Sequence, residues 1–346
     1  MNLLNEQLSM VSLSVTERSR PGRREFLAGG IATVASMLVP KAAWASAAPR
    51  PELKSITSRI GDIEVARVYE TTIFVKASSW FPDLEEGALA PYLPWLVPHY
   101  YDPATGLLPM PIQSWILRSA GKIVLIDTGF GNDKIREGYP EADRIRTPYL
   151  ARMKEIGIRP EDVDVVICTH LHLDHSGWNT LLEDGRWTPT FPNARYIWSL
   201  ADQKDARQLA TGPNPFPFTR GVYADSIKPI IESGQAQPIT GDFALDENIL
   251  LRPTPGHSPG TLRVDVTSGD NRAVFCGDML HSPLQIPLWN ISSAGDFDKD
   301  MAAKARHELL SFCAEKNAVL VAGHFAAPHV ARIYMENGSF LPKFGW

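Results

Sequence analysis

The chain has 346 residues, of which 44% are hydrophobic and 21% charged, a composition that excludes disordered, collagen-like and coiled-coil proteins. Its formal net charge of −5 provides no cationic field for a polyanion, so nucleic acid is not expected as a partner. The cysteines Cys168, Cys276 and Cys313 are odd in number and widely spaced, and they predict neither a disulfide framework nor a cysteine-based zinc cluster. Nine histidines remain to be explained, three of them within residues 170–175.

Residues 1–45 have the pattern of a cleaved export signal. The pair Arg23 and Arg24, followed by Phe-Leu, resembles a twin-arginine signal. The uncharged stretch 27–39 is shorter than the roughly 20 residues needed to cross a bilayer, and small residues lead up to a cleavage position after Ala45. We therefore expect a periplasmic or secreted protein with no membrane anchor after cleavage.

The first part of the expected mature chain combines a strand with a long irregular loop. Residues 63–69 alternate apolar and polar side chains, which predicts a half-buried strand. Residues 78–111 hold seven prolines among six aromatic residues, so we predict no regular secondary structure there. Such a loop forms a flap over a site, a subunit contact that would make a homodimer, or an ordinary surface insertion.

The remaining elements alternate in a way that favours two sheets covered by helices. A hairpin is expected over 114–118 and 122–126, further strands at 163–168, 249–252, 262–266, 273–276 and 318–321, and helices at 148–156, 199–209, 222–233 and 297–315. Strands dominate both ends and helices lie between. We therefore predict an α+β sandwich and a single domain spanning residues 46–346.

A predicted buried strand runs directly into the sequence Thr-His-Leu-His-Leu-Asp-His at 169–175. His170 and His172 are two residues apart in extended chain and therefore face the same way. Asp174 and His175, after a turn, face a second point nearby. Imidazole and carboxylate groups are the ligands that zinc and similar cations prefer.

Potential ligands also follow three other predicted strands: His257 lies beyond 249–252, Asp278 beyond 273–276 and His324 beyond 318–321. Clustered histidines can be a surface accident or a passive metal scavenger. Seven ligand-type residues at four strand ends argue against both, and the sequence predicts a catalytic metal centre.

The motif H-x-H-x-D-H at 170–175 resembles that of the metallo-β-lactamase-fold superfamily, and Asp127-Thr128-Gly129 matches a recurring turn of that family. The resemblance runs from about residue 63 to the C-terminus. It implies a four-layer αββα sandwich holding two divalent metal ions, with zinc the first choice and manganese, cobalt or iron as alternatives. By this resemblance His170, His172 and His257 hold one metal, Asp174, His175 and His324 hold the other, Asp278 bridges them, and Asp127 orients the ligands.

The resemblance implies hydrolysis by a hydroxide that bridges the two metals. Asp174, beside that nucleophile, would take a proton from it. His281, three residues after Asp278, would contact the substrate oxygen or protonate a leaving alkoxide, the alternative being a solvent-facing loop histidine. Four tryptophans, Trp80, Trp95, Trp115 and Trp289, are candidates to line an apolar pocket, although core packing is the default for each.

Within the superfamily the sequence is similar to the exported branch that contains methyl parathion hydrolase and N-acyl-homoserine lactonases. The residues 201–206 and 324–328 carry the likeness to the former, and Gly260-Thr261 departs from its pattern. The expected substrate is therefore a small-molecule lactone, ester or organophosphate triester. A β-lactamase is disfavoured, because class B β-lactamases either have a cysteine at the place of Asp278 or lack this bridging ligand.

Two alternatives remain open at this point. A mononuclear iron oxygenase of the persulfide dioxygenase type is built on the same fold, and one iron per chain would favour it. The second alternative is a protein that binds metal without catalysing a reaction.

Overall fold

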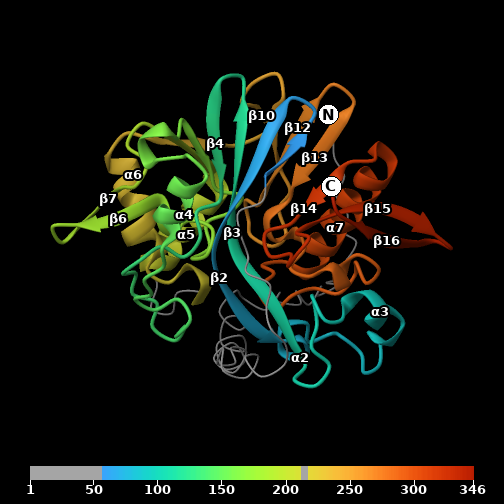
Figure 1. Ribbon diagram of the computed structural model, residues 1–346. Coiled ribbons are helices and arrows are strands. Elements are labelled where there is room, and N and C mark those ends of the chain that lie inside the picture. Colours follow the sequence, from blue (N-terminus) through green and yellow to red (C-terminus); the bar gives the residue numbers. More distant parts are fainter. Residues whose placement is uncertain (1–56, 212–216) are drawn as a thin grey trace, which may run out of the picture.

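The computed structural model describes residues 57–211 and 217–346. Two seven-stranded sheets form its centre (Figure 1). The first sheet contains, in spatial order, β1 (Thr57–Ile60), β2 (Ile63–Lys76), β3 (Leu107–Ser119), β4 (Lys122–Ile126), β5 (Val165–Ile167), β8 (Arg195–Ser199) and β9 (Ala236–Ile239). The second contains β10 (Phe243–Ala244), β11 (Ile249–Pro253), β12 (Leu262–Ser268), β13 (Asn271–Phe275), β14 (Val319–Val321), β15 (Val330–Glu336) and β16 (Ser339–Phe344). A separate hairpin pairs β6 (Thr180–Glu183) with β7 (Arg186–Pro189).

The two sheets pack against each other through one face of each strand. Val124 and Ile126 of β4 contribute to the core between the sheets, whereas Leu125 contributes to the core on the outer face. Val321 of β14 likewise lies between the sheets and Leu320 outside them. Because successive side chains of a strand point to opposite faces, these fully apolar strands are buried on both sides, and each sheet needs a helical cover.

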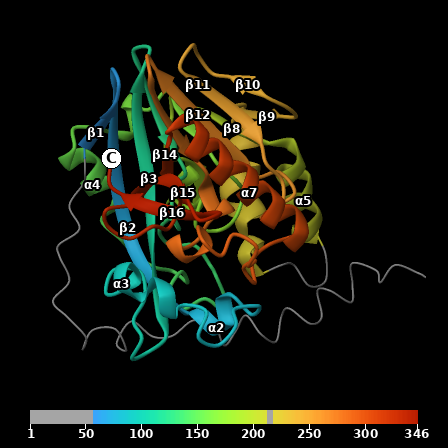
Figure 2. The ribbon, with the colours of Figure 1, turned by 90° about the vertical axis from the view of Figure 1, so that its right-hand side faces the viewer.

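Helices supply that cover on the two outer faces. The helices α4 (Tyr149–Glu155), α5 (Leu200–Thr211) and α6 (Lys228–Glu232) lie on the side of the first sheet, and α7 (Lys299–Lys316) lies on the side of the second (Figures 1 and 2). Leu309, Leu310 and Cys313 of α7 are fully buried against the second sheet. The structure is therefore a four-layer αββα sandwich, as predicted.

The segment 78–111 is more regular than its prolines predicted. It contains the end of α2 (Ala77–Trp80), a 3-10 turn at Ala90–Tyr92 and α3 (Leu93–Leu96), and β3 begins within it at Leu107. The prediction of no regular structure was wrong for these short helical elements and for residues 107–111. There β3 pairs only with β2, since β4 pairs with residues 115–119, so the prolines occupy a stretch with one free edge where missing N–H groups do no harm.

Other elements differ from the sequence-based expectation in length or number. Six strands of the two main sheets lie outside the predicted set: β1, β8, β9, β10, β15 and β16. The predicted helix 222–233 is a π-helical turn at Tyr223–Ile227 followed by α6. The hairpin at Ala120-Gly121 forms as predicted, and the predicted strands 262–266 and 273–276 correspond to β12 and β13, which pair antiparallel.

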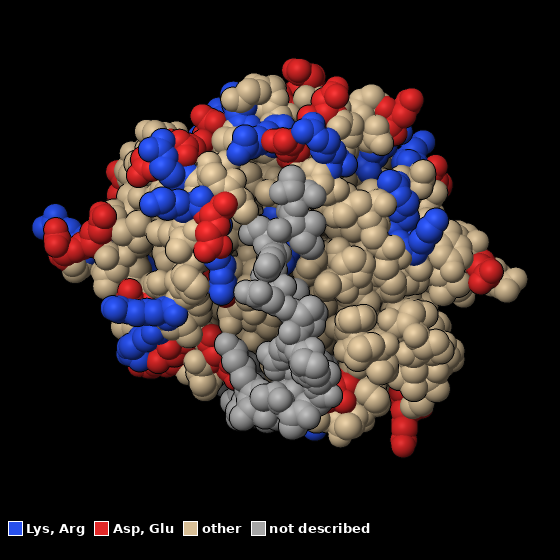
Figure 3. Space-filling model, viewed as in Figure 1, with Lys and Arg blue, Asp and Glu red and all other residues tan. Residues whose placement is uncertain are grey.

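The predicted leader at 1–45 lies outside the described residues. Within 57–211 and 217–346, no helix combines the length and apolarity needed to span a bilayer. Figure 3 shows basic and acidic side chains intermixed on the viewed face, with an uncharged area over α3. The subunit contact that residues 78–111 would make in a homodimer stays a prediction.

Candidate metal centre

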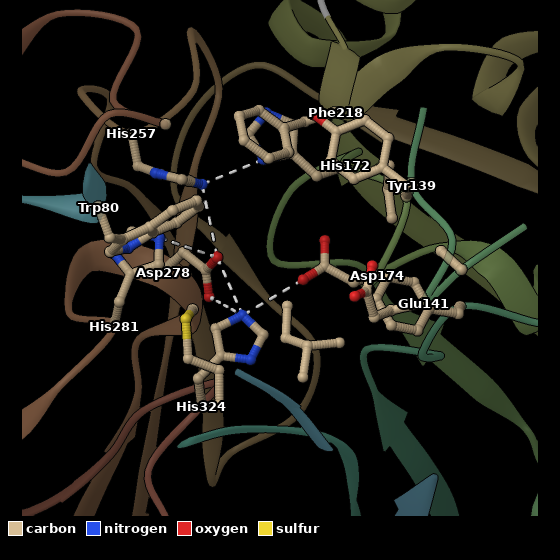
Figure 4. Close-up of a pocket in the computed structure, with 16 residues that line it drawn as sticks. Trp80, Tyr139, Glu141, His172, Asp174, Phe218, His257, Asp278, His281 and His324 are labelled. Atoms are coloured by element: carbon tan, nitrogen blue, oxygen red, sulfur yellow. Dashed lines mark hydrogen bonds and ion pairs between the residues drawn. The ribbon is translucent and has the colours of Figure 1, made fainter. Parts of the chain in front are cut away.

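The seven predicted ligands come together at one end of the sandwich, where strands of both sheets end. His170 follows β5 and His324 follows β14, while Asp278 lies in a 3-10 turn directly after β13. Neighbouring β13 and β14 are parallel, so their carboxyl ends lie side by side and bring Asp278 to His324. The fold thus converts strand ends that are distant in sequence into one cluster (Figure 4).

Three histidines form the first ligand group. Nε2 of His170 lies 3.0 Å from Nδ1 of His172, and Nε2 of His257 lies 3.2 Å from the first atom and 3.1 Å from the second. All three residues are buried. Three ring nitrogens therefore face one point.

The second ligand group consists of Asp174, His175, Asp278 and His324. Oδ2 of Asp278 lies 3.3 Å from Nε2 of His175 and 3.2 Å from Nε2 of His324. Oδ2 of Asp174 lies 3.3 Å from the same His324 nitrogen. The Asp278 carboxylate is also 3.6 Å from Nε2 of His257, so it stands between the two groups (Figure 4).

The outward-facing nitrogens of three of these rings are held by acceptors. Nδ1 of His175 lies 2.9 Å from Oδ2 of Asp127, Nδ1 of His257 lies 3.0 Å from Oδ1 of Asp296, and Nδ1 of His324 lies 2.9 Å from the carbonyl oxygen of Pro111. A carbonyl or carboxylate oxygen accepts, so each Nδ1 carries the hydrogen. In the neutral rings Nε2 then has a free lone pair that points into the cluster.

This donor set fits a pair of divalent cations. Lone pairs of His170, His172 and His257 about 3 Å apart repel one another unless a cation lies among them. In the second group, Nε2 of His175 and Oδ1 of Asp278 are buried atoms without a hydrogen-bond partner. Nitrogen and oxygen ligands of this kind suit zinc and its neighbours in the first transition row, and the identity of the metal stays open.

Charges within the second group shift its pKa values strongly. Burial opposes a charged imidazolium, yet the facing carboxylates of Asp278 and Asp174 raise the pKa of His324 to about 10. The pKa of His175 is also raised well above its usual value, against the effect of burial, by Asp278, Asp174 and Asp127. In the first group, burial and the neighbouring rings lower the pKa of His170 and of His172, which keeps both rings neutral.

Asp127 fixes the second group through a left-handed backbone turn after β4. Its φ is 57°, which aims the carboxylate back at the strand end next to it. There Oδ1 accepts from the backbone N–H of Thr169, while Oδ2 holds the ring of His175. Asp127 thereby occupies the supporting position that the resemblance implied.

His281 lies inside the site rather than in solvent. It is 1% exposed, its Nε2 is 3.2 Å from Oδ2 of Asp278, and both ring nitrogens lack a hydrogen-bond partner. His257, Asp278 and His281 could by themselves hold a metal. The alternative of a solvent-facing histidine was wrong, because the turns after β13 fold His281 back against Trp80, whose ring centroid lies 5.2 Å away.

A largely apolar pocket opens above the cluster, with an empty volume of about 590 Å³. Its lining includes five of the seven ligand residues (His172, Asp174, His257, Asp278 and His324) and His281. The rest of the lining includes Ile73, Trp80, Met110, Phe130, Tyr139, Glu141, Leu173 and Phe218 (Figure 4). Of the four tryptophans considered from the sequence, only Trp80 lines this pocket. Tyr139, Glu141 and Phe218 belong to segments without any motif, so sequence reasoning missed them.

Asp296 is a further functional residue that the sequence did not reveal. It is buried, holds the ring of His257 and accepts from Ser293, and its other oxygen lies 3.4 Å from the guanidinium of Arg306. The pKa of Asp296 is lowered, against burial, by its hydrogen bond to His257 and by Arg306. An isolated aspartate ahead of a predicted helix carries no pattern that identifies such a role.

Fold and site together define a metal-dependent hydrolase class in which two sheets present histidine and aspartate ligands at their common end. The model of the metallo-beta-lactamase superfamily matches residues 107–324. That is more than half of the chain, and the chain belongs to this superfamily.

Sequence relatives and solved structures agree with this placement. An N-acyl homoserine lactonase from Bacillus cereus is 28% identical over 169 residues, which cover 44% of this chain and 57% of the relative. The solved structure of AidC, a dizinc quorum-quenching lactonase in complex with a product, has a TM-score of 0.69 at 20% identity, covering 85% of this chain and 98% of the other. The hydrolase AbOPH has a TM-score of 0.70 at 21% identity, covering 86% and 100%.

Proposed function

We propose that the protein is an exported dinuclear metallohydrolase that opens a lactone or cleaves another neutral ester, organophosphate triesters included. One observation carries the proposal: residues of both ligand groups line a single apolar pocket. The lactonase from Bacillus cereus supports the ester class, although the match covers little more than half of that relative.

When bound at this site, two divalent ions supply a hydroxide at neutral pH and polarise the bond to be cleaved. Asp174 is the proton acceptor in this proposal. Its side chain is 15% exposed, it lines the pocket, and its Oδ2 is held 3.3 Å from Nε2 of His324. Its carboxylate therefore lies where the ligands meet the substrate space.

His281 is the proposed contact to the substrate oxygen. Burial lowers its pKa, which keeps the ring neutral, and neither ring nitrogen has a hydrogen-bond partner. A neutral imidazole can donate one hydrogen bond to a carbonyl oxygen or a leaving alkoxide. The stacked arrangement of its ring on that of His324, with centroids 6.0 Å apart, fixes its direction.

The pocket chemistry favours an uncharged substrate with an apolar body. Trp80 and Tyr139 each contact Phe218, with ring centroids 5.7 Å apart in both pairs, and form an aromatic wall. Three buried polar atoms in this wall and at its rim lack partners: Nε1 of Trp80, the hydroxyl of Tyr139 and Oε2 of Glu141. They offer hydrogen bonds to polar groups of a substrate that the apolar surface holds in place.

The iron oxygenase alternative has less support, because ligands for two metals are present and two metals fit the donor set. A direct test is metal analysis of purified protein combined with a panel of acyl-homoserine lactones, aliphatic lactones, aryl esters and methyl parathion. We expect two metals per chain and turnover of at least one ester class, which His175→Ala abolishes. One iron per chain with oxygen uptake and no hydrolysis would contradict the proposal.

Export rests on the leader at 1–45, with its Arg23-Arg24 pair. Cell fractionation tests it: the protein should leave the cytoplasm in processed form, and Arg23→Lys combined with Arg24→Lys should retain it there. Retention of the unaltered protein in the cytoplasm would contradict export without affecting the proposed chemistry.

A further inference from the structure

A buried aspartate on α5 joins two loops of the metal centre. Asp202, 4% exposed, lies in the first turn of the helix. Its Oδ2 accepts the backbone N–H of Leu171 at 3.2 Å, and Leu171 stands between His170 and His172. The residue is not part of either ligand group.

The same carboxylate holds the loop that carries His257. Oδ1 of Asp202 accepts the backbone N–H of Gly260 at 2.6 Å, and Oδ2 accepts the hydroxyl of Ser258 at 3.0 Å. Gly260 permits this approach, since a Cβ there would lie 2.3 Å from Oγ of Ser199 and 2.8 Å from the Asp202 nitrogen. The helix start and the loop are therefore in direct contact.

We infer that Asp202 is a positioning residue that sets His257 against His170 and His172, and that it governs retention of the metal at this three-histidine position. Side-chain atoms of one residue hold both loops, so a shift of one loop is transmitted to the other. A neighbouring backbone hydrogen bond, 2.7 Å from the N–H of Leu262 to the carbonyl oxygen of Thr169, joins the strand ends. Thr169 precedes His170 and Leu262 follows His257, so this bond does not hold the ligands themselves.

The second ligand group has a separate support. His175 is held by Asp127 and His324 by Pro111, and Asp202 contacts neither. Removing the Asp202 link should therefore loosen one metal and leave the other unchanged. A residue that only contributed to folding would affect both metals, so faster loss of one metal identifies a positioning role. This expectation does not depend on which ester the protein cleaves.

The test follows release of zinc from the fully loaded protein to a chelating indicator. In Asp202→Asn one amide NH2 group replaces an acceptor oxygen, so the backbone N–H of either Leu171 or Gly260 loses its acceptor. We expect one zinc per chain to leave at least about tenfold faster than in the unaltered protein, because replacing a partner that supports a metal ligand typically has an effect of about 10–100-fold. The other zinc should leave at the original rate. Asp205→Asn removes a carboxylate from the same helix and serves as the control.

Two further measurements keep the outcome decisive. Thermal unfolding of the metal-free proteins should give the same shift for Asp202→Asn and Asp205→Asn within a few degrees. If Asp202→Asn fails to fold, Ser258→Ala removes the hydroxyl that bonds Asp202 and Thr261, keeps both backbone bonds to Asp202, and should accelerate loss of the same single zinc. Unchanged release, or equal acceleration of both zinc ions, would overturn the inference.

Discussion

Nε2 of His257 lies 3.2 Å from Nε2 of His170, although 87 positions separate the two residues in the chain. His170 follows a strand of the first sheet, and His257 lies in the loop between two strands of the second. The contact therefore exists only when both sheets are packed together. Because of this, metal binding and the packing of the sandwich should stabilise each other.

Removing His257 should disable the first ligand group. We expect His257→Ala to lower kcat/KM at least about 100-fold. Removing a residue that only supports a metal ligand typically costs about 10–100-fold, and removing the ligand itself should cost more. Ester hydrolysis and metal content should fall together. His307→Ala is the matched control. His307 lies in α7 outside the pocket lining, its ring packs on Trp289, and its replacement should leave kcat/KM within about twofold. Unchanged metal content in His257→Ala would contradict the assignment.

Metal binding should release protons. In the metal-free protein the pKa of His324 is about 10 and that of His175 is also raised, so both rings hold a proton at pH 7 that a metal must displace. Affinity should therefore rise with pH and weaken as pH falls. Calorimetric titration of metal-free protein with zinc, in buffers of different ionisation enthalpy, measures the number of protons. Binding without proton release would show that these rings are not the ligands.

The buried carboxylate of Asp225 should matter for stability more than a surface one. It accepts from both terminal nitrogens of the Arg136 guanidinium, at 2.6 and 3.0 Å, and lies 3.7 Å from Nζ of Lys134. Both cations are fully buried, so Asp225→Asn should lower the free energy of unfolding by about 3–5 kcal/mol. Asp133→Asn breaks the exposed pair with Arg146 and should cost less than about 1 kcal/mol. Denaturant titration of both variants checks the difference, and equal effects would refute it.

Glu141 should select for substrates that carry an N–H group near the pocket rim. Its Oε2 is buried without a partner in the pocket lining, and an N–H donor would satisfy it. Glu141→Leu should raise KM at least about tenfold for an N-acylated amino lactone, because a hydrogen bond to a charged group contributes about 1.5–3 kcal/mol. The corresponding lactone without the amide should be unaffected. Glu137→Leu, at an exposed position in the same loop, is the control, and equal KM changes for both lactones would exclude this role.

Much of the metal centre was predictable because its ligands follow apolar strands. Val165–Ile167 and Val319–Val321 are short apolar runs rich in β-branched residues, and His170 and His324 come shortly after them. Strand and ligand can therefore be recognised together. Asp296 could not be found in this way, since its partners His257 and Arg306 are assembled only by tertiary packing. The start of β3 was missed for a related reason: proline at 109 and 111 is excluded from a central strand, but only the sheet order reveals that this stretch has a free edge.

Hydrolysis should need both ligand groups filled. The most direct measurement is the rate of ester hydrolysis by metal-free protein as zinc is added in known amounts per chain. Activity should rise until two zinc ions per chain are bound, and His324→Ala should never reach the activity of the unaltered protein. Full activity at one ion per chain, or no hydrolysis of any ester at two, would contradict a dinuclear hydrolase.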